Sequence, residues 1–156
     1  HKYAAGLTLK KENLPAFIQR FEEVVSNTIT AEMQIPKINI DLEMPMEDIT
    51  MKTYRIIEQM APFGPSNSRP VFMTKEVIDN GSGRLIGQDK NHLKLAITDN
   101  YYSKILDGIG FGMSDHFSTI KDKQTFDVCF VLDLNELNGT TNLQLRVKDI
   151  RKNTLS

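Results

Sequence analysis

The side chains best suited to metal binding or nucleophilic chemistry are three histidines, His1, His92 and His116, and one cysteine, Cys129. Zinc sites and cysteine or serine nucleophiles need several such groups in contact, and zinc ligands often follow one another at short spacings. No histidine here has a neighbour at ligand spacing, and Cys129 stands alone. Asp115, next to His116, is more simply explained as the start of a helical turn. We therefore expect no catalytic residue and no metal ligand in this chain.

Basic side chains at alternating strand positions suggest a different chemistry, the binding of phosphate groups. Arg84, His92 and Lys94 lie on the polar faces of two neighbouring predicted strands, and Arg146 and Lys148 lie on the polar face of another. Such positions are either ordinary solvated surface or a groove that follows a nucleic-acid backbone.

Three further segments also allow two interpretations each. The loop 62–70 is either a rigid connector or a phosphate-facing turn that uses backbone N–H groups and Arg69. Tyr101 and Tyr102 either stack on bases or cap one end of a barrel. The glycine-rich run 108–112 lacks the spacing of a dinucleotide-binding loop and indicates close backbone approach or a bulge.

Composition limits the remaining classes. The chain has 156 residues and a net charge of −1, which argues against a dedicated, strongly basic nucleic-acid binder. Residues 1–68 carry 7 basic and 9 acidic side chains (−2), and residues 69–156 carry 12 and 11 (+1). No stretch approaches the roughly 20 apolar residues of a membrane span, so no membrane contact is expected. The single cysteine fits a reducing cytoplasm, and the start at His1 suggests a piece of a longer protein.

The N-terminal part is predicted to be mixed helix and strand. Residues 3–9 are typical of a short strand, and a helix from about Asn13 to about Glu32 follows. That helix has one apolar stripe at helical spacing: Leu14, Phe17, Ile18, Phe21 and Val25. Residues 37–44 alternate as a half-buried strand does, and a second helix is predicted over about 50–61.

From residue 69 onward, the pattern predicts short strands. They cover approximately 70–78, 84–88, 92–98, 105–111, 126–132 and 143–148, with a hairpin turn at 79–83 and a helical interruption at 114–118. Five or so such strands favour a small closed barrel, of which the OB-fold is one option. The predicted fold class is α+β: an OB-fold-like barrel preceded by a strand–helix segment.

Several segments together resemble the single-stranded-DNA-specific exonucleases of the RecJ type. His-Lys-Tyr-Ala-Ala-Gly at 1–6 is similar to a motif of the DHHA1 domain of that family. The segment 58–72, with its Pro-Phe-Gly-Pro-Ser-Asn-Ser-Arg-Pro run, resembles another family motif, and 92–95, 109–111 and 143–151 match in the same order. Ser66 and Ser68 depart from the family pattern, which has Gly and Pro there.

The resemblance implies that residues 1–33 end a DHHA1-like domain and that residues 34–156 form a nucleic-acid-binding OB-fold domain. It also implies a parent enzyme that degrades single-stranded DNA from the 5′ end in recombination and repair. The Mn²⁺ or Mg²⁺ of that enzyme would belong to a DHH domain that this chain lacks, so the chain itself is expected to be inactive.

Two functional hypotheses remain open. In the first, the chain helps to bind single-stranded DNA, with contacts from His1, Arg69, Arg84, His92, Lys94, Arg146 and Lys148. In the second, it is a structural or protein-interaction module that braces the nuclease domains or docks a partner such as single-stranded DNA-binding protein. The near-neutral charge favours the second.

Overall fold

The computed structural model describes residues 4–99, 104–122, 124–137 and 139–153, and it contains two compact units, His1–Lys37 and Ile38–Ser156. The first unit consists of a 15-residue helix, α1 (Leu14–Thr28), between two short 3₁₀ turns, η1 (Lys11–Asn13) and η2 (Ala31–Gln34). The strand predicted over 3–9 is wrong for the described residues, because residues 4–10 are irregular and have no neighbouring strand to pair with.

Helix α1 keeps its apolar stripe on the surface. Within this unit no residue of the helix is buried, and Leu14, Ile18 and Phe21 are all exposed. Asn13 precedes the helix but makes no side-chain capping bond. Helix α1 ends at Thr28, earlier than the predicted Glu32. None of the described helices is both long and apolar enough to cross a membrane.

The second unit begins with a strand much shorter than predicted. Only Leu42–Glu43 (β1) pair with the barrel, in parallel with the first barrel strand, whereas the alternation over 37–44 predicted a full strand. Of the apolar residues in this alternation, Ile38, Ile40 and Leu42 are exposed and only Met44 is buried. The pattern failed because alternation specifies a face only where a neighbouring strand is present to pair with it. A turn, η3 (Met46–Asp48), and helix α2 (Met51–Glu58) follow.

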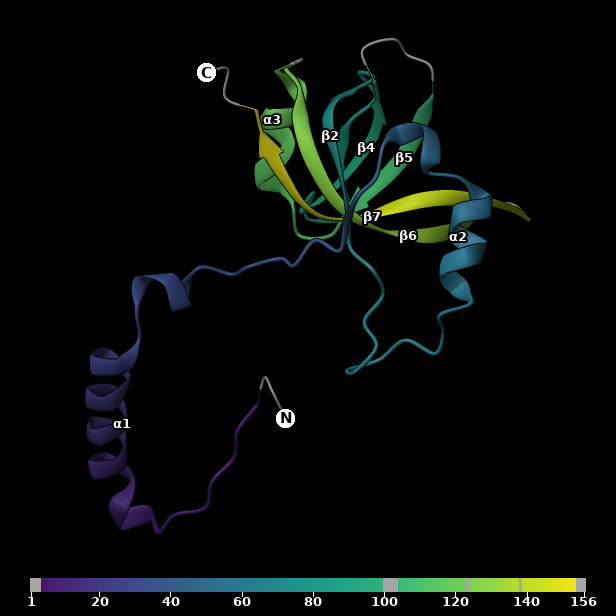
Figure 1. Cartoon of the computed structure of the whole chain (residues 1–156). Helices are drawn as coiled ribbons and strands as arrows, with labels where there is room; N and C mark the ends of the chain where they lie inside the picture. The colour runs from purple at the N-terminus through teal and green to yellow at the C-terminus, as the bar shows by residue number, and fades with distance from the viewer. Residues whose placement is uncertain (1–3, 100–103, 123, 138, 154–156) are drawn as a thin grey trace. The chain divides into compact units, whose positions relative to one another are not determined.

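Five strands form the barrel: β2 (Phe72–Asp79), β4 (His92–Thr98), β5 (Ile105–Gly110), β6 (Phe126–Leu137) and β7 (Thr140–Lys152) (Figure 1). Neighbours run β2–β6–β7–β5–β4, and a β2–β4 pairing closes the circle. The β5–β7 pairing is parallel, and the turn η4 (Ser114–His116) and helix α3 (Phe117–Lys121) connect β5 to β6. This closed five-stranded barrel agrees with the predicted OB-fold-like α+β class.

The turn at 79–83 is present, but it does not make the predicted hairpin. The short strand β3 (Arg84–Ile86) pairs with β4 and not with β2. The buried carboxylate of Asp79 orders the turn by accepting hydrogen bonds from the N–H groups of Gly81, Gly83 and Ala96 at 2.8–3.0 Å. The carboxylate therefore fastens the turn to β4, so the chain leaves β2 without folding back along it.

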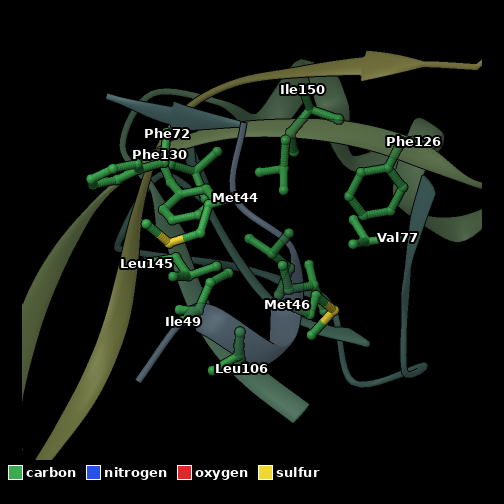
Figure 2. Packing of buried hydrophobic residues seen from close by; sticks show 14 of the residues in the cluster. Met44, Met46, Ile49, Phe72, Val77, Leu106, Phe126, Phe130, Leu145 and Ile150 are labelled. Atoms are coloured by element: carbon green, nitrogen blue, oxygen red, sulfur yellow. The ribbon is translucent and has the colours of Figure 1, made fainter. Parts of the chain in front are cut away.

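The barrel interior is a single apolar cluster (Figure 2). Phe72 of β2 and Phe130 of β6 lie with ring centroids 6.1 Å apart. The apolar residues that alternate along the sequences of β4, β6 and β7 point inward; they include Leu93, Leu95, Ile97, Phe126, Val128, Leu132, Leu145 and Val147. Alternation along β4 would place Thr98 on the polar face, but it is buried at the end of the strand where β4 pairs with both β2 and β5.

Candidate nucleic-acid interface

Four neighbouring strands bring three basic side chains into one row across the outside of the barrel. Arg84 on β3 pairs with Lys94 on β4, Lys94 pairs with Ile109 on β5, and Ile109 pairs with Arg146 on β7. Paired residues on neighbouring strands share a face, and Leu95 beside Lys94 points into the core, so the row faces outward. We call Arg84, Lys94 and Arg146 the basic row; at about 4.8 Å per strand it spans roughly 14 Å of backbone.

The cations of the basic row are available to a ligand. Arg84 and Arg146 are exposed and Lys94 is half-buried. Among the described residues, no carboxylate lies within 4 Å of Arg84 or Lys94, and the contact of Arg146 with Asp133 is long, at 3.9 Å. The row is therefore a local positive strip on a molecule whose net charge is close to zero.

An exposed aromatic ring lies beside the row. Phe111, the residue after β5, is 52% exposed, and its ring centroid lies 5.2 Å from that of His92 in an edge-to-face arrangement. The guanidinium carbon of Arg146 is 5.4 Å from the Phe111 ring centroid. The backbone N–H of Gly112 donates to Nδ1 of His92 at 3.1 Å. His92, proposed from the sequence as a DNA contact, thus lies next to Phe111.

Sequence reasoning missed Phe111 because it treated the run 108–112 only as a backbone feature. A signal was present: Phe111 lies two residues after Ile109, so it continues the outward side of the strand. An apolar ring at an outward position between two glycines has no core to join, so exposure of Phe111 could be expected from the sequence.

The other side of the row is acidic. Asp107 pairs with Ala96 and lies two residues before Ile109, and Asp133 pairs with Gln144, two residues before Arg146. Both carboxylates belong to the outward set of their strands. A polyanion that binds this face is therefore stabilised where it lies on the basic row and Phe111. It is destabilised where it lies on Asp107 and Asp133.

Lys148 lies outside the row, although it shares a strand with Arg146. It occupies an irregularity between the Phe130–Val147 and Cys129–Asp149 pairs, where β7 has one extra residue. Its neighbour Asp149 lies 3.6 Å from Nε2 of His116. Lys148 is exposed, and its role in DNA contact stays a prediction.

The guanidinium of Arg69 is engaged in contacts within the protein. It pairs with the carboxylate of Glu58 at the end of α2, lies 4.5 Å from the Phe63 ring centroid and reaches the carbonyl of Leu132 at 3.4 Å. These contacts favour the rigid-connector interpretation of this loop, and phosphate binding by Arg69 stays a prediction.

The side chain of Asn67 ties the same loop together from within. Its amide donates to the carbonyls of Met60 and Pro62 at 2.8 and 3.0 Å, and Gly64 and Asn67 exchange backbone hydrogen bonds. Ser66 and Ser68, which depart from the family pattern, lie exposed on either side of Asn67.

The remaining chemical candidates are limited. Within the described ranges, no three His, Cys, Asp or Glu side chains come close enough together to hold a metal ion. The donor set near His116 is a single pair with Asp149, which does not fit the octahedral oxygen ligation that Mg²⁺ and Mn²⁺ prefer. His1, Tyr101 and Tyr102 lie outside the described residues, so their expected roles stay predictions.

Residues 40–149 of this sequence match the family of the RecJ OB domain. The chain belongs to this family. Among curated relatives, the single-stranded-DNA-specific exonuclease RecJ of Bacillus subtilis (strain 168) is 33% identical over 96% of this chain, and that of Escherichia coli (strain K12) is 26% identical over 96%. The chain spans only 19% and 25% of the lengths of these two relatives.

The solved structure of RecJ from Thermus thermophilus, in complex with Mn²⁺, has the same fold. It superposes with a TM-score of 0.71 at 17% identity, covering 96% of this chain and 21% of that one. The resemblance to RecJ exonucleases that the sequence motifs indicated is therefore confirmed. The predicted OB-fold-like barrel is confirmed as well.

Proposed function

We propose that the barrel binds single-stranded DNA on the outer face of β4, β5 and β7. The observation that carries this proposal is the basic row of cations without close carboxylate partners, set beside an exposed aromatic ring. In chain order β4 and β5 are the second and third strands of the five-stranded barrel, and OB-folds bind oligonucleotides on that face. Phosphate contacts of this kind fix the position of a strand without reading its sequence.

The whole protein is proposed to be a metal-dependent exonuclease specific for single-stranded DNA that acts from the 5′ end in recombination and repair in the cytoplasm. Support comes from the relatives named as such exonucleases and from the Mn²⁺ in the solved RecJ structure. The metal would be held outside this chain, whose described residues offer no fitting donor set. The purified chain should leave labelled single strands intact with Mn²⁺ or Mg²⁺; release of mononucleotides would contradict this.

The division of the chain is proposed to follow the family. Residues 1–33 would end a DHHA1-like domain, and residues 34–156 would form the OB-fold domain. The boundary between the two compact units, at Lys37–Ile38, lies four residues from this division.

A second function, protein interaction, is favoured by one specific observation in the first unit. Within that unit α1 leaves its apolar stripe exposed, and an isolated 15-residue amphipathic helix depends on packing for its stability. We propose that this stripe contacts protein, either another domain of the same protein or a partner such as single-stranded DNA-binding protein.

Salt-dependent binding of a labelled oligonucleotide tests the first proposal. By fluorescence anisotropy, the chain should bind single-stranded oligothymidine with a Kd on the order of 10⁻⁴–10⁻⁶ M near physiological salt. Three phosphate contacts predict that log K falls with log[salt] at a slope of about −2, because each contact to a single strand contributes about −0.7. Binding that does not weaken as salt rises would contradict the electrostatic mechanism.

A further inference from the structure

Phe111 is held in place by backbone geometry and not by burial. Gly110 packs on Met113 so closely that a Cβ there would lie 2.6 Å from the Met113 sulfur. Gly112 has a φ of +67°, a conformation that favours glycine, and its N–H donates to His92. Both positions beside Phe111 therefore require glycine, and the β5 pairing before the ring and the Gly112–His92 hydrogen bond after it hold the chain so that the ring points outward.

The surroundings of the ring suit a planar, polyanionic ligand. The His92 ring meets the Phe111 ring at an interplanar angle of 74°, and the Arg146 guanidinium lies over the Phe111 ring in a cation–π contact. About half of Phe111 remains exposed, next to the positive charge of Arg146. An aromatic ring beside an arginine provides both a stacking surface and a phosphate contact, the combination found in single-strand binding sites.

We propose that Phe111 is the base-stacking residue of this face, where one unpaired base lies on its ring while the basic row contacts the phosphates. The inference rests on the proposed function and extends it to the origin of strand preference. Bases in a duplex are already stacked and paired, so only a single strand can offer a free base face to Phe111. Because every base has such a face, the contact tolerates any sequence.

The test compares three labelled oligonucleotides of one length: oligothymidine, an abasic strand and a duplex. The unaltered chain should bind oligothymidine roughly 5- to 150-fold more tightly than the abasic strand, the range expected for one stacked base. Phe111→Ala should remove most of this preference and leave both the affinity for the abasic strand and the salt slope unchanged. Phe111→Tyr, which keeps the ring, should retain it.

Ile105→Ala is the matched control, because Ile105 is an equally exposed apolar residue of β5, at 54% against 52% for Phe111. It should bind oligothymidine as the unaltered chain does, and thermal unfolding should show that both alanine variants remain folded. Equal affinity of the unaltered chain for oligothymidine and the abasic strand would overturn the role of Phe111 alone. A loss of oligothymidine affinity from Ile105→Ala equal to the loss from Phe111→Ala would also overturn the role of Phe111 alone. Absence of salt-dependent binding to any of the three would overturn the proposed function as well.

Discussion

The barrel carries basic side chains on two parts of its outer surface, and the two parts differ in whether those cations are neutralised. On β2 and the C-terminal end of β7, each of three cations has a carboxylate within 2.7 Å, whereas the basic row has none closer than 3.9 Å among the described residues. The neutralised pairs are Lys75–Glu43, Arg151–Asp127 and Lys152–Asp122. We call these three pairs together the paired face, although Arg151 and Lys152, as consecutive residues of β7, point to opposite sides of that strand.

The difference shows that the count of basic residues does not locate a phosphate-binding surface. Two opposite charges in contact largely cancel at distances greater than their separation, whereas an unpaired charge acts out to about the Debye length, roughly 8 Å at physiological salt. An approaching DNA strand is therefore attracted mainly by the basic row, although the paired face has as many cations. The net charge of −1 hides this arrangement because it sums every charge of the chain, wherever it lies.

The largest effect on stability is expected from Leu95→Ala, which tests whether the basic row lies on the outer surface. Leu95 is 1% exposed, and its neighbour Lys94 points to the opposite face. Leu95→Ala should lower the free energy of unfolding by roughly 2–5 kcal/mol, because it removes buried contacts and leaves a cavity. Denaturant unfolding followed by circular dichroism measures this change.

Lys94→Ala is the control for that experiment. It removes a partly exposed side chain and should change the free energy of unfolding by about 0.5 kcal/mol or less, as surface substitutions usually do. Comparable losses from both substitutions would mean that the faces of β4 are assigned wrongly and that the basic row does not exist as described.

The fold was predictable where strands have partners on both sides. Alternation in β4, β6 and β7 placed the apolar core residues correctly, because these strands lie within the closed barrel, but it did not predict that Ala96, Thr98, Asp127 and Val131 on the other side are buried as well. It failed over residues 37–44, where only Leu42–Glu43 find a neighbour. The hairpin signal at 79–83 predicted a turn but not its partner strand, because β3 instead pairs with β4 across the short connection 87–91.

The candidate site was predictable only in part, for a related reason. Arg84, Lys94 and Arg146 were selected as single basic positions, yet their alignment into a row depends on the registers of three separate strand pairings. Arg69 was selected for its charge, and the structure gives it Glu58 and Phe63 as partners. Charge is a property of the sequence, whereas pairing depends on the fold.

An intermediate effect is expected on the paired face, from Asp127→Asn. Asp127 is 5% exposed, and it accepts hydrogen bonds from Arg151 at 2.7 Å and from the N–H of Glu76 at 3.2 Å. The substitution removes the charge that these donors stabilise and should cost roughly 1–3 kcal/mol of unfolding free energy at pH 7. Thermal or denaturant unfolding at pH 7 checks the size of the loss.

The loss of stability caused by Asp127→Asn should also depend on pH. Burial raises the pKa of Asp127, but the hydrogen bonds donated by Arg151 and Glu76 outweigh it and hold the pKa below its usual value. A lowered pKa in the folded state stabilises the fold above the unfolded pKa, near 3.9, and this contribution is lost as pH falls through the folded pKa. The stability difference between Asp127→Asn and the unaltered chain should therefore be full at pH 7 and shrink below about pH 4. A difference that stays constant down to about pH 2 would show that the Arg151–Asp127 pair is not its source.

The smallest expected effect is the one that separates the two faces directly. Lys94→Gln and Lys75→Gln each remove one positive charge, so the net charge of the two variants is the same. Lys94 has no carboxylate partner within 4 Å among the described residues, whereas Lys75 lies 2.6 Å from Glu43, whose hydrogen bond and charge raise the pKa of Lys75. A slope of about −0.7 per phosphate contact corresponds to roughly fourfold in affinity at 0.15 M salt, so Lys94→Gln should weaken oligothymidine binding by about that factor and make the salt slope about 0.7 less steep. Lys75→Gln should leave both quantities within error of the unaltered chain, because Lys75 lies on β2, outside the proposed binding face, and makes no phosphate contact there. Equal losses from the two variants in the same anisotropy titration would mean that overall charge, and not the basic row, attracts the strand.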